Sequence, residues 1–495
     1  MNLESNLGFS KNPFSKKSSE QEIDFLDEIF YTPNFYDTLT DDLSNGDSRF
    51  IIGQRGHGKS SIINKLFEDL NNKGCFVLKI DRFDDIPLKK NETAFIRLIL
   101  KHIITKFCLD LFKNKRKLKK LDIIDKDKLC SFQRIFYGGL NDNEYSKIYD
   151  SIKKIETKNF LIKLFNNFGI SFVNNVANSV TMFTSSTIRD SLGLEKGNSD
   201  YIHKKYFQEI KLIEFQKLDA EKISFKKTEL KLILDEVLKI VEKVGYSKTV
   251  ILFDKIDEVQ DLNQDIDQIV SFTKEILTDT ELLMNENIAI GFSLWSELKF
   301  ALSGKVRFDK FGTIDVRWNS ADLEPLIDLR LLHFSVKKPI SFSDLIPNKN
   351  FRNDIVRVAN KSPRDLISCL AEIYLVQSNT NKESNFFEDE SISKGLISFC
   401  RDFDYESLFP ARIKKNTEIR AMIQRLLAVK LLRFSLKDLQ ETFKQSVGQS
   451  EGQVKVMMGY KLIEEDDILG TNGQKFYEVI DPKVEYLIKR AITNL

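Results

Sequence analysis

The feature that most constrains this chain is a glycine-rich stretch at residues 50–61, FIIGQRGHGKSS. Only 21 of the 495 residues are glycine, yet three of them lie within six positions of this stretch. Residues 53–60 match G-x-x-x-x-G-K-[ST], the pattern of a loop whose backbone N–H groups surround a phosphate. Glycine allows positive φ and a close backbone approach, and the helix that follows directs its positive end at the anion. We therefore expect a phosphate-binding loop between a strand and a helix.

The expected ligand of this loop is ATP with Mg²⁺. Lys59 supplies a point charge for the β- and γ-phosphates, and the Ser60 hydroxyl is a magnesium ligand. His57 fills a variable position, near phosphate or, as the more favoured alternative, facing solvent. The residues expected to bind the cofactor are Gly53, Gly56, His57, Gly58, Lys59, Ser60 and Ser61.

A second acidic motif follows a strongly apolar segment in VILFDKIDE, residues 250–258. Asp254 comes at the carboxyl end of the expected strand, where ligands of open α/β sheets bind, so we assign it to magnesium. Asp257 or Glu258 would then orient the attacking water, with a solvated turn as the alternative for both.

The pattern of strands and helices predicts an α/β P-loop NTPase core with a parallel sheet. Apolar strands are expected at 48–53, 75–81, 248–254 and 287–294, with helices at 61–73 and 265–285. The chain is expected to divide into an entry segment (1–48), a first core part (49–112), a large helical insertion (113–240), a second core part (241–335), a helical lid (336–414) and a C-terminal domain (415–495).

The C-terminal domain is expected to be similar to a winged helix. Two short helices near 435–460 precede an alternating pair of strands around Asn472-Gly473, a hairpin dipeptide. The second helix would present Gln449, Gln453 and Lys455, with several glutamates nearby. Such a helix can enter a DNA major groove, but its weak positive charge favours a protein contact equally.

Composition restricts the partners and the compartment. The 75 basic and 73 acidic residues nearly cancel, so nucleic-acid binding would need a local patch such as the basic run 113–120, which is more often a solvated face. The five cysteines have no metal-binding spacing and predict reduced thiols. The start of the chain lacks a signal-peptide pattern, and residues 161–183 contain too many asparagines for a membrane span. We expect a cytoplasmic protein without a membrane partner.

Four segments together resemble the AAA+/STAND group of P-loop ATPases, and especially bacterial KAP-like ATPases of mobile-element and phage-defence operons. These are GQRGHGKS, VILFDKIDE, the opening LGFSKNPF, and KSPRDLISCLAEIY at 361–374. The last resembles the sensor-2 helix of origin-recognition ATPases, which implies that Arg364 reaches the γ-phosphate. One departure is Lys255, where many ring-forming relatives have glutamate, so rapid hydrolysis does not carry over.

Further site residues are expected beyond the two motifs. Ser293 would end a strand at a sensor-1 position, with a plain strand-end turn as the alternative. One of Arg307, Arg317 and Arg330 would act as an arginine finger on a neighbouring subunit, and Arg307 is our choice, with salt bridges as the alternative for all three. This assignment implies a homo-oligomer.

Three functions remain open at this level. The leading hypothesis is an ATP-binding and hydrolysing switch or motor that assembles and controls a separate effector, such as a nuclease, in phage defence. The alternatives are a DNA-binding remodelling or loading ATPase and a non-hydrolysing nucleotide-gated scaffold.

Overall fold

The computed structural model describes residues 2–122, positions 124, 125, 128, 129, 132 and 136, and residues 225–409, 416–468 and 474–495. Most of the expected insertion, the 161–183 segment, Cys130 and the Asn472-Gly473 hairpin lie outside the described residues.

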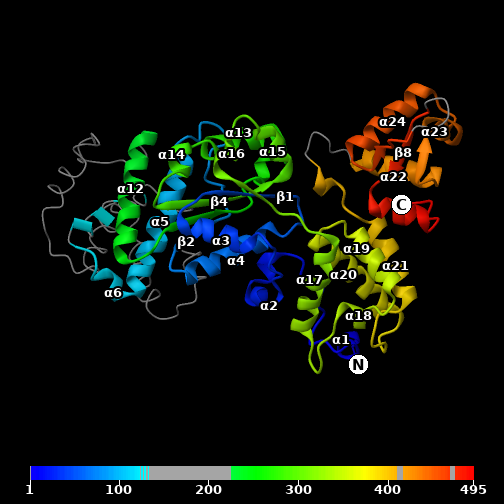
Figure 1. Ribbon diagram of the computed structural model, residues 1–495, viewed down its shortest axis with the longest axis horizontal. Coiled ribbons are helices and arrows are strands. Elements are labelled where there is room, and N and C mark those ends of the chain that lie inside the picture. The colour runs from blue at the N-terminus through cyan, green and yellow to red at the C-terminus, as the bar shows by residue number, and fades with distance from the viewer. Residues whose placement is uncertain are drawn as a thin grey trace, which may run out of the picture.

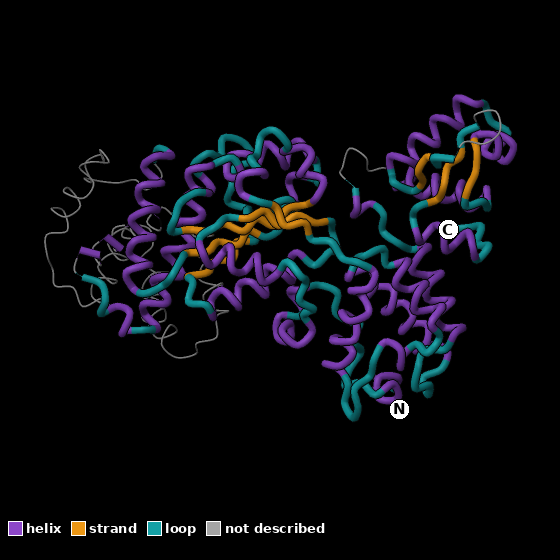
Figure 2. The backbone as a smooth tube through the Cα atoms, in the orientation of Figure 1, coloured by secondary structure: helices purple, strands orange, loops and turns teal. Residues whose placement is uncertain are grey.

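A five-stranded parallel sheet forms the centre of the larger part of the molecule (Figures 1 and 2). Its strand order is β2-β3-β4-β1-β5, so β3 and β4 separate the strand that precedes the glycine loop from the next strand in sequence. The parallel α/β core expected from the sequence is confirmed. The strands are β1 (Arg49–Gly53), β2 (Phe76–Ile80), β3 (Thr249–Phe253), β4 (Ile288–Trp295) and β5 (Thr313–Asp315).

Both faces of this sheet are covered, which explains why its strands are apolar without alternation. Ile51 packs into a core with α3 and α4 on one face, whereas its neighbours Phe50 and Ile52 pack into a second core on the other. The helices of the first face are α3 (Tyr36–Asn45) and α4 (Lys59–Asn72). Those contributing to the second core include α5 (Ala94–Lys113), α12 (Lys227–Val244), α13 (Ile266–Leu277), α14 (Thr280–Leu283) and α15 (Ser296–Leu302).

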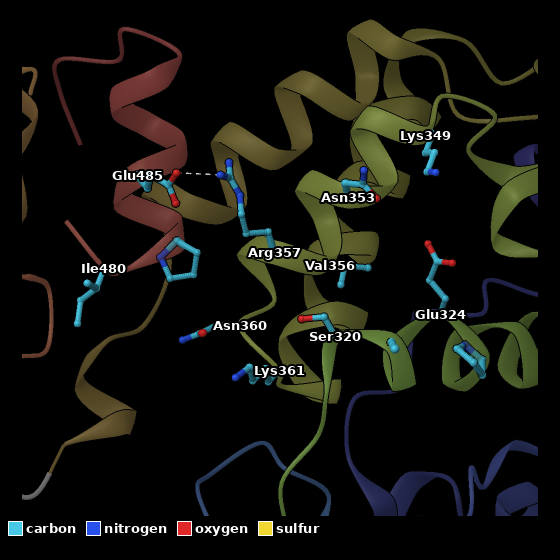
Figure 3. Close-up of a pocket in the computed structure, with 13 residues that line it drawn as sticks. Ser320, Glu324, Lys349, Asn353, Val356, Arg357, Asn360, Lys361, Ile480 and Glu485 are labelled. Carbon is cyan, nitrogen blue, oxygen red and sulfur yellow. Dashed lines mark hydrogen bonds and ion pairs between the residues drawn. The ribbon is translucent and has the colours of Figure 1, made fainter. Parts of the chain in front are cut away.

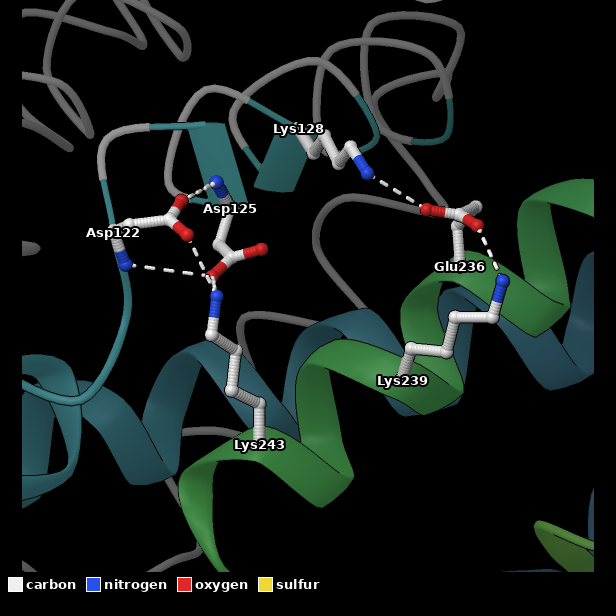
Figure 4. Close-up of polar contacts among 6 residues, drawn as sticks. All are labelled: Asp122, Asp125, Lys128, Glu236, Lys239 and Lys243. Atoms are coloured by element: carbon white, nitrogen blue, oxygen red, sulfur yellow. Dashed lines mark hydrogen bonds and ion pairs between the residues drawn. The ribbon is translucent and has the colours of Figure 1, made fainter.

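Helix α12 belongs to the sheet's own core, although most of it lies in the range assigned to the insertion. It packs along α5, and its exposed side is tied to the chain that follows α6 (Lys115–Leu118). Lys243 binds Asp122 and Asp125 at 2.7 and 2.5 Å, and Glu236 accepts from Lys128 at 2.7 Å (Figure 4).

A third hydrophobic core unites segments from the two ends of the chain. The N-terminal segment, the helices after β5 and the C-terminal module all contribute to it, and the first helix lies beside these late helices (Figure 1). The N-terminal elements are α1 (Leu3–Leu7), η1 (Ser19–Gln21), η2 (Ile23–Phe25) and α2 (Leu26–Ile29). The helices that we call the lid are α17 (Ser320–Phe334), α18 (Phe342–Leu345), α19 (Lys349–Val358), α20 (Pro363–Thr380) and α21 (Asp389–Arg401), followed by η5 (Glu406–Leu408). This lid begins before the expected boundary at 336, because α17 buries its apolar residues in the third core and not in the cores of the sheet.

The C-terminal module combines helices with a three-stranded antiparallel sheet of order β6-β8-β7. Its elements are α22 (Asn416–Val429), β6 (Arg433–Ser435), α23 (Leu436–Phe443), α24 (Val447–Gly459), β7 (Ile463–Glu465), β8 (Phe476–Val479) and α25 (Pro482–Lys489). Helix α25 returns to the lid and packs on α19 and α21.

Two findings concern the compositional expectations. No described helix has both the length and the apolarity needed to cross a bilayer. Cys75, Cys108, Cys369 and Cys400 are buried free thiols.

The packing of α20 on α21 predicts the effect of one glycine. A Cβ at Gly395 would lie 2.6 Å from the Ile373 Cα, so the two helix backbones would have to separate. We expect Gly395→Ala to lower the free energy of unfolding by about 1–3 kcal/mol, measured by urea denaturation. Gly452→Ala in α24 is the matched control, because nothing lies within 4 Å of its added Cβ. The control should be neutral or gain up to about 1 kcal/mol. Equal effects of both substitutions would contradict this packing.

Candidate nucleotide site

The glycine loop joins β1 to α4 in the conformation that its composition predicts. Gly56 and Gly58 have φ of 85° and 78°, in the left-handed region that favours glycine. Lys59 is the first residue of α4, and its Nζ donates to the carbonyl oxygens of Gly53 and Gln54 at 2.9 and 3.1 Å. The ammonium group therefore lies over the loop, at the positive end of the helix. Burial lowers its pKa, and the charges of Asp257, Glu258 and Asp254 oppose that shift.

His57 does not face solvent, in contrast with the favoured expectation. The residue is 9% exposed, and its Nδ1 lies 3.2 Å from the Val316 carbonyl oxygen. Trp318 Nε1 donates to the His57 carbonyl oxygen at 2.9 Å. The imidazole thus anchors the back of the loop to the segment after β5, and His57 is not among the residues that line the pocket.

The first turn of the lid helix α20 lies directly against the phosphate loop. Arg364 N donates to the Gly56 carbonyl oxygen at 3.3 Å, and a Cβ at Gly56 would lie 2.7 Å from Ser362 Oγ. The left-handed φ favours glycine here, and a side chain would also displace the Ser362 hydroxyl. The Arg364 side chain is exposed and lines the same pocket as Lys59.

Ser60 and Asp254 meet at the carboxyl edge of the sheet. The Ser60 hydroxyl donates to Asp254 Oδ1 at 3.2 Å. Asp254 is 1% exposed, and its Oδ2 is buried without a protein hydrogen-bond partner. Burial raises the pKa of this carboxyl, while Ser60, Lys79 and Ser293 partly offset the shift. A hydroxyl beside a carboxylate with an unused oxygen fits the hard oxygen ligands that Mg²⁺ prefers.

Ser293 is brought to this edge by the strand register. Phe253 pairs with Phe292, so Asp254, just after β3, and Ser293, inside β4, lie side by side. Ser293 is 1% exposed and lines the pocket. The register therefore explains how two residues far apart in sequence meet.

The two acids considered for water activation have different environments. Asp257 is 3% exposed, and its Oδ2 accepts the Trp295 backbone N–H at 2.9 Å, which ties it to the end of β4. Burial raises the pKa of Asp257 to about 6 against the opposing charge of Lys59. Glu258 is exposed and lines the pocket. Solvent in the pocket can thus reach Glu258 more readily than Asp257.

Lys255 contacts a segment that sequence reasoning did not place here. The residue has φ of 59°, and its Nζ binds the Glu20 carboxylate of η1. Lys17, Ser18, Ser19, Glu20 and Glu22 all line the pocket, whose volume is about 250 Å³. A lysine among the acids of residues 254–258 is compatible with an ion pair, but nothing in the sequence indicates that Glu20 is the partner.

Arg55 is a second residue that sequence reasoning left without a role. Its guanidinium lies 4.6 Å from the ring centroid of Trp295, a cation–π contact at the end of β4. Arg55 lines the pocket, and its positive charge acts to lower the pKa of both Lys59 and Asp257. The loop therefore adds a second cation near the phosphate position.

The three arginines considered as fingers lie in three different settings. Arg330 is buried and binds Glu22 at 2.6 Å and the carbonyl oxygens of Pro13 and Lys16, so it fixes the N-terminal segment to α17 and is not available to a neighbour. Arg317 is exposed beside Asp315. Arg307 precedes α16 (Phe308–Phe311) and makes a surface pair with Asp309.

Arg307 lies at the sheet edge opposite the phosphate loop. Thr313, just after α16, pairs with Phe50 near the start of β1, whereas the loop follows the end of β1. Its side chain is 62% exposed, and it is not among the residues that line the chain's own pocket.

The outer regions also depart from expectation in part. Gln453 of α24 is half-buried and exchanges hydrogen bonds with Gln445, whereas Gln449 and Lys455 are exposed as predicted. In the basic run, Lys117 binds Asp110 and Lys120 donates to the Val244 carbonyl oxygen.

A second cavity of about 750 Å³ lies between α17, α19 and α25, with Lys349, Lys361 and the Arg357–Glu485 pair along it (Figure 3).

Comparisons with known proteins give distant similarities. No family model matches the chain, and no curated protein matches it. Among solved structures, Cdc6p from Pyrobaculum aerophilum is 11% identical, covering 99% of this chain and 98% of that one, with a TM-score of 0.31. The Aeropyrum pernix ORC1 protein in complex with DNA is 9% identical, covering 95% of this chain and 96% of that one, with a TM-score of 0.37. Drosophila ORC bound to DNA is 10% identical, covering 99% of this chain and 90% of that one, with a TM-score of 0.28. Because these TM-scores are below 0.5, the P-loop NTPase fold rests on the chain's own strand order and glycine loop.

The raised pKa of Asp257 predicts a pH-dependent stability. The folded protein holds this proton up to about pH 6, whereas the unfolded chain releases it near pH 3.9. Its contribution to the free energy of unfolding therefore falls as pH rises between these values. We expect Asp257→Asn, which keeps an acceptor for Trp295, to be more stable than the wild type by about 2 kcal/mol at pH 8.

The measurement is urea unfolding at pH 8 and pH 4.5. The gain should shrink to about 1 kcal/mol or less at pH 4.5, because the wild-type carboxyl is then protonated in the folded state. A gain that is the same at both pH values would show that the buried charge is not its source.

Proposed function

We propose that this protein is a Mg²⁺-dependent ATP-binding and ATP-hydrolysing switch of the AAA+ type. The observation that carries the proposal is the pocket between the sheet and the lid. It brings together the loop lysine Lys59, the buried acid Asp254 with its unused oxygen, and Arg364 from α20. A triphosphate in this pocket would touch both bodies, so its γ-phosphate can control how they are held together.

Each residue has a distinct chemical role in this proposal. Lys59 and the loop N–H groups bind the β- and γ-phosphates, with Arg55 adding positive charge. Ser60 and Asp254 hold Mg²⁺, which would neutralise phosphate charge. Glu258 orients the attacking water, because it is the exposed acid of the pocket, and Asp257 secures the strand ends. Arg364 binds the γ-phosphate from the lid.

Lys59→Ala should weaken ATP affinity at least about tenfold, because a charge-assisted contact to phosphate is lost. Asp254→Asn should remove the difference between ATP binding with Mg²⁺ and with a chelator. Calorimetric titration measures both effects. Lys73→Ala is the control, since Lys73 pairs with Asp41 at the surface beyond the end of α4. Unchanged ATP affinity in Lys59→Ala would refute the site.

The same preparation separates binding from hydrolysis. Glu258→Gln should retain ATP affinity and lose about 10²-fold in turnover, the scale of a positioned base. Normal turnover in Glu258→Gln would return the role to Asp257. Absence of turnover in the wild type would favour the nucleotide-gated scaffold.

We further propose that subunits assemble and that Arg307 completes a neighbour's site. Its position at the opposite sheet edge, with an exposed side chain, supports a contact in trans. A neighbouring arginine that stabilises phosphoryl charge raises turnover by orders of magnitude.

An Arg307→Ala protein and a Lys59→Ala protein should each be inactive alone and regain turnover when mixed. Mixed assemblies would contain sites with an intact loop and an intact neighbouring arginine. Steady-state turnover against mixing ratio is the measurement, and Arg317→Ala mixed with Lys59→Ala is the control. No rescue, with turnover per subunit independent of concentration, would indicate a monomeric switch.

The C-terminal module is proposed to be a winged helix that contacts an effector protein. The element order and the three-stranded sheet support the fold. Exposed Val447 and Met458 on α24, with Glu451 beside Lys455, favour a protein partner over DNA.

The resemblance to KAP-like ATPases is the basis for proposing a phage-defence role, and loss of protection in a Lys59→Ala strain during phage challenge would test it.

A further inference from the structure

Lys483 is a charged residue with an unusual position. It lies in the first turn of α25 in the C-terminal module, and it is 1% exposed. Its Nζ lies 3.2 Å from Asp365 Oδ2 and 3.9 Å from the ring centroid of Phe403. A buried ammonium is costly without an opposite charge, so this ion pair strongly constrains both partners.

Asp365 belongs to the turn that touches the phosphate loop. It follows Arg364 directly, and its backbone N–H donates to the Ser362 Oγ cap at 3.2 Å. Ser362 and Arg364 are the two lid residues that contact Gly56. The negative charge of Asp365 also acts to raise the pKa of His57 in the loop, against the larger effect of burial. A displacement of Asp365 would therefore move Arg364 relative to the phosphates.

The other end of the contact is firmly held. Asp481 Oδ1 caps α25 by accepting the Lys483 and Val484 N–H groups, and it also accepts the Tyr405 hydroxyl at 2.9 Å. Glu485 binds Arg357 of α19 at 2.8 Å. The backbone that carries Lys483 thus has two fixed attachments apart from its own ion pair.

We propose that Lys483 is a positioning residue for the nucleotide site: through Asp365 it sets the first turn of α20 and so places Arg364 at the γ-phosphate. The inference rests on the proposed ATP function. It makes the C-terminal module part of the site without contact with the nucleotide. A partner that moves α25 would change how the site distinguishes ATP from ADP, and by reciprocity ATP would change partner affinity.

The readout is the ratio of ADP to ATP dissociation constants, because Arg364 acts only on the γ-phosphate. Calorimetry with Mg²⁺ gives both constants. We expect Lys483→Met to reduce the preference for ATP by about tenfold, within the range of coupling between sites. Arg364→Ala should do the same, and the double variant should be no worse than Arg364→Ala alone, because both act on one contact. Lys489→Met is the matched control on the same helix, because the Lys489 side chain is 46% exposed and pairs with Glu485 and not with Asp365.

Asp365→Asn is the second variant, because it keeps the side-chain volume while removing the charge. It should lower the ATP preference even if Lys483→Met does not fold, as judged by circular dichroism. A preference that is retained in the folded variants, or additive losses in the double variant, overturns the inference while leaving ATP binding intact. A wild-type protein that binds neither nucleotide overturns the proposed function itself.

Discussion

The contact between the phosphate loop and the first turn of α20 places Arg364 of the lid in the same pocket as Lys59 of the loop. Gly56 lies at this contact, and its lack of a side chain lets Ser362 and the Arg364 backbone approach the loop. The buried apolar residues of the sheet and of the lid fall into separate hydrophobic cores, and Phe30 packs against one core of each. At this contact the two bodies are joined by a polar interaction, the hydrogen bond from the Arg364 N–H to the Gly56 carbonyl oxygen.

Charge balance inside the pocket follows from this arrangement. Lys59, Arg55 and Arg364 line the side that would face phosphates, while Asp254, Asp257 and Glu258 follow the end of β3. Lys255 does not add to the cationic group, because its ammonium is engaged with Glu20. The N-terminal segment is in turn held to the lid by the buried Arg330–Glu22 pair, so it spans both bodies.

The third core explains why distant parts of the chain act together. The N-terminal helices, the lid and the C-terminal module bury their apolar residues in one continuous cluster. Lys483 and Asp365 connect this cluster to the turn that carries Arg364. In our proposal, a displacement of α25 would therefore reach the pocket through Lys483 and Asp365, whose side chains are 2% and 15% exposed.

The sequence by itself determined the elements whose chemistry is local. The spacing of Gly53, Gly58, Lys59 and Ser60 predicted the loop, because positive φ, a helix start and a phosphate cation must follow one another along the chain. The apolar run before Asp254 likewise predicted a buried strand that ends in an acid. Only the tertiary structure decided that Ser293 stands beside Asp254, that His57 is buried, that Glu20 lines the pocket, and that Lys483 pairs with Asp365. Those contacts depend on strand register and on packing between segments far apart in sequence, for which local residue patterns carry no signal.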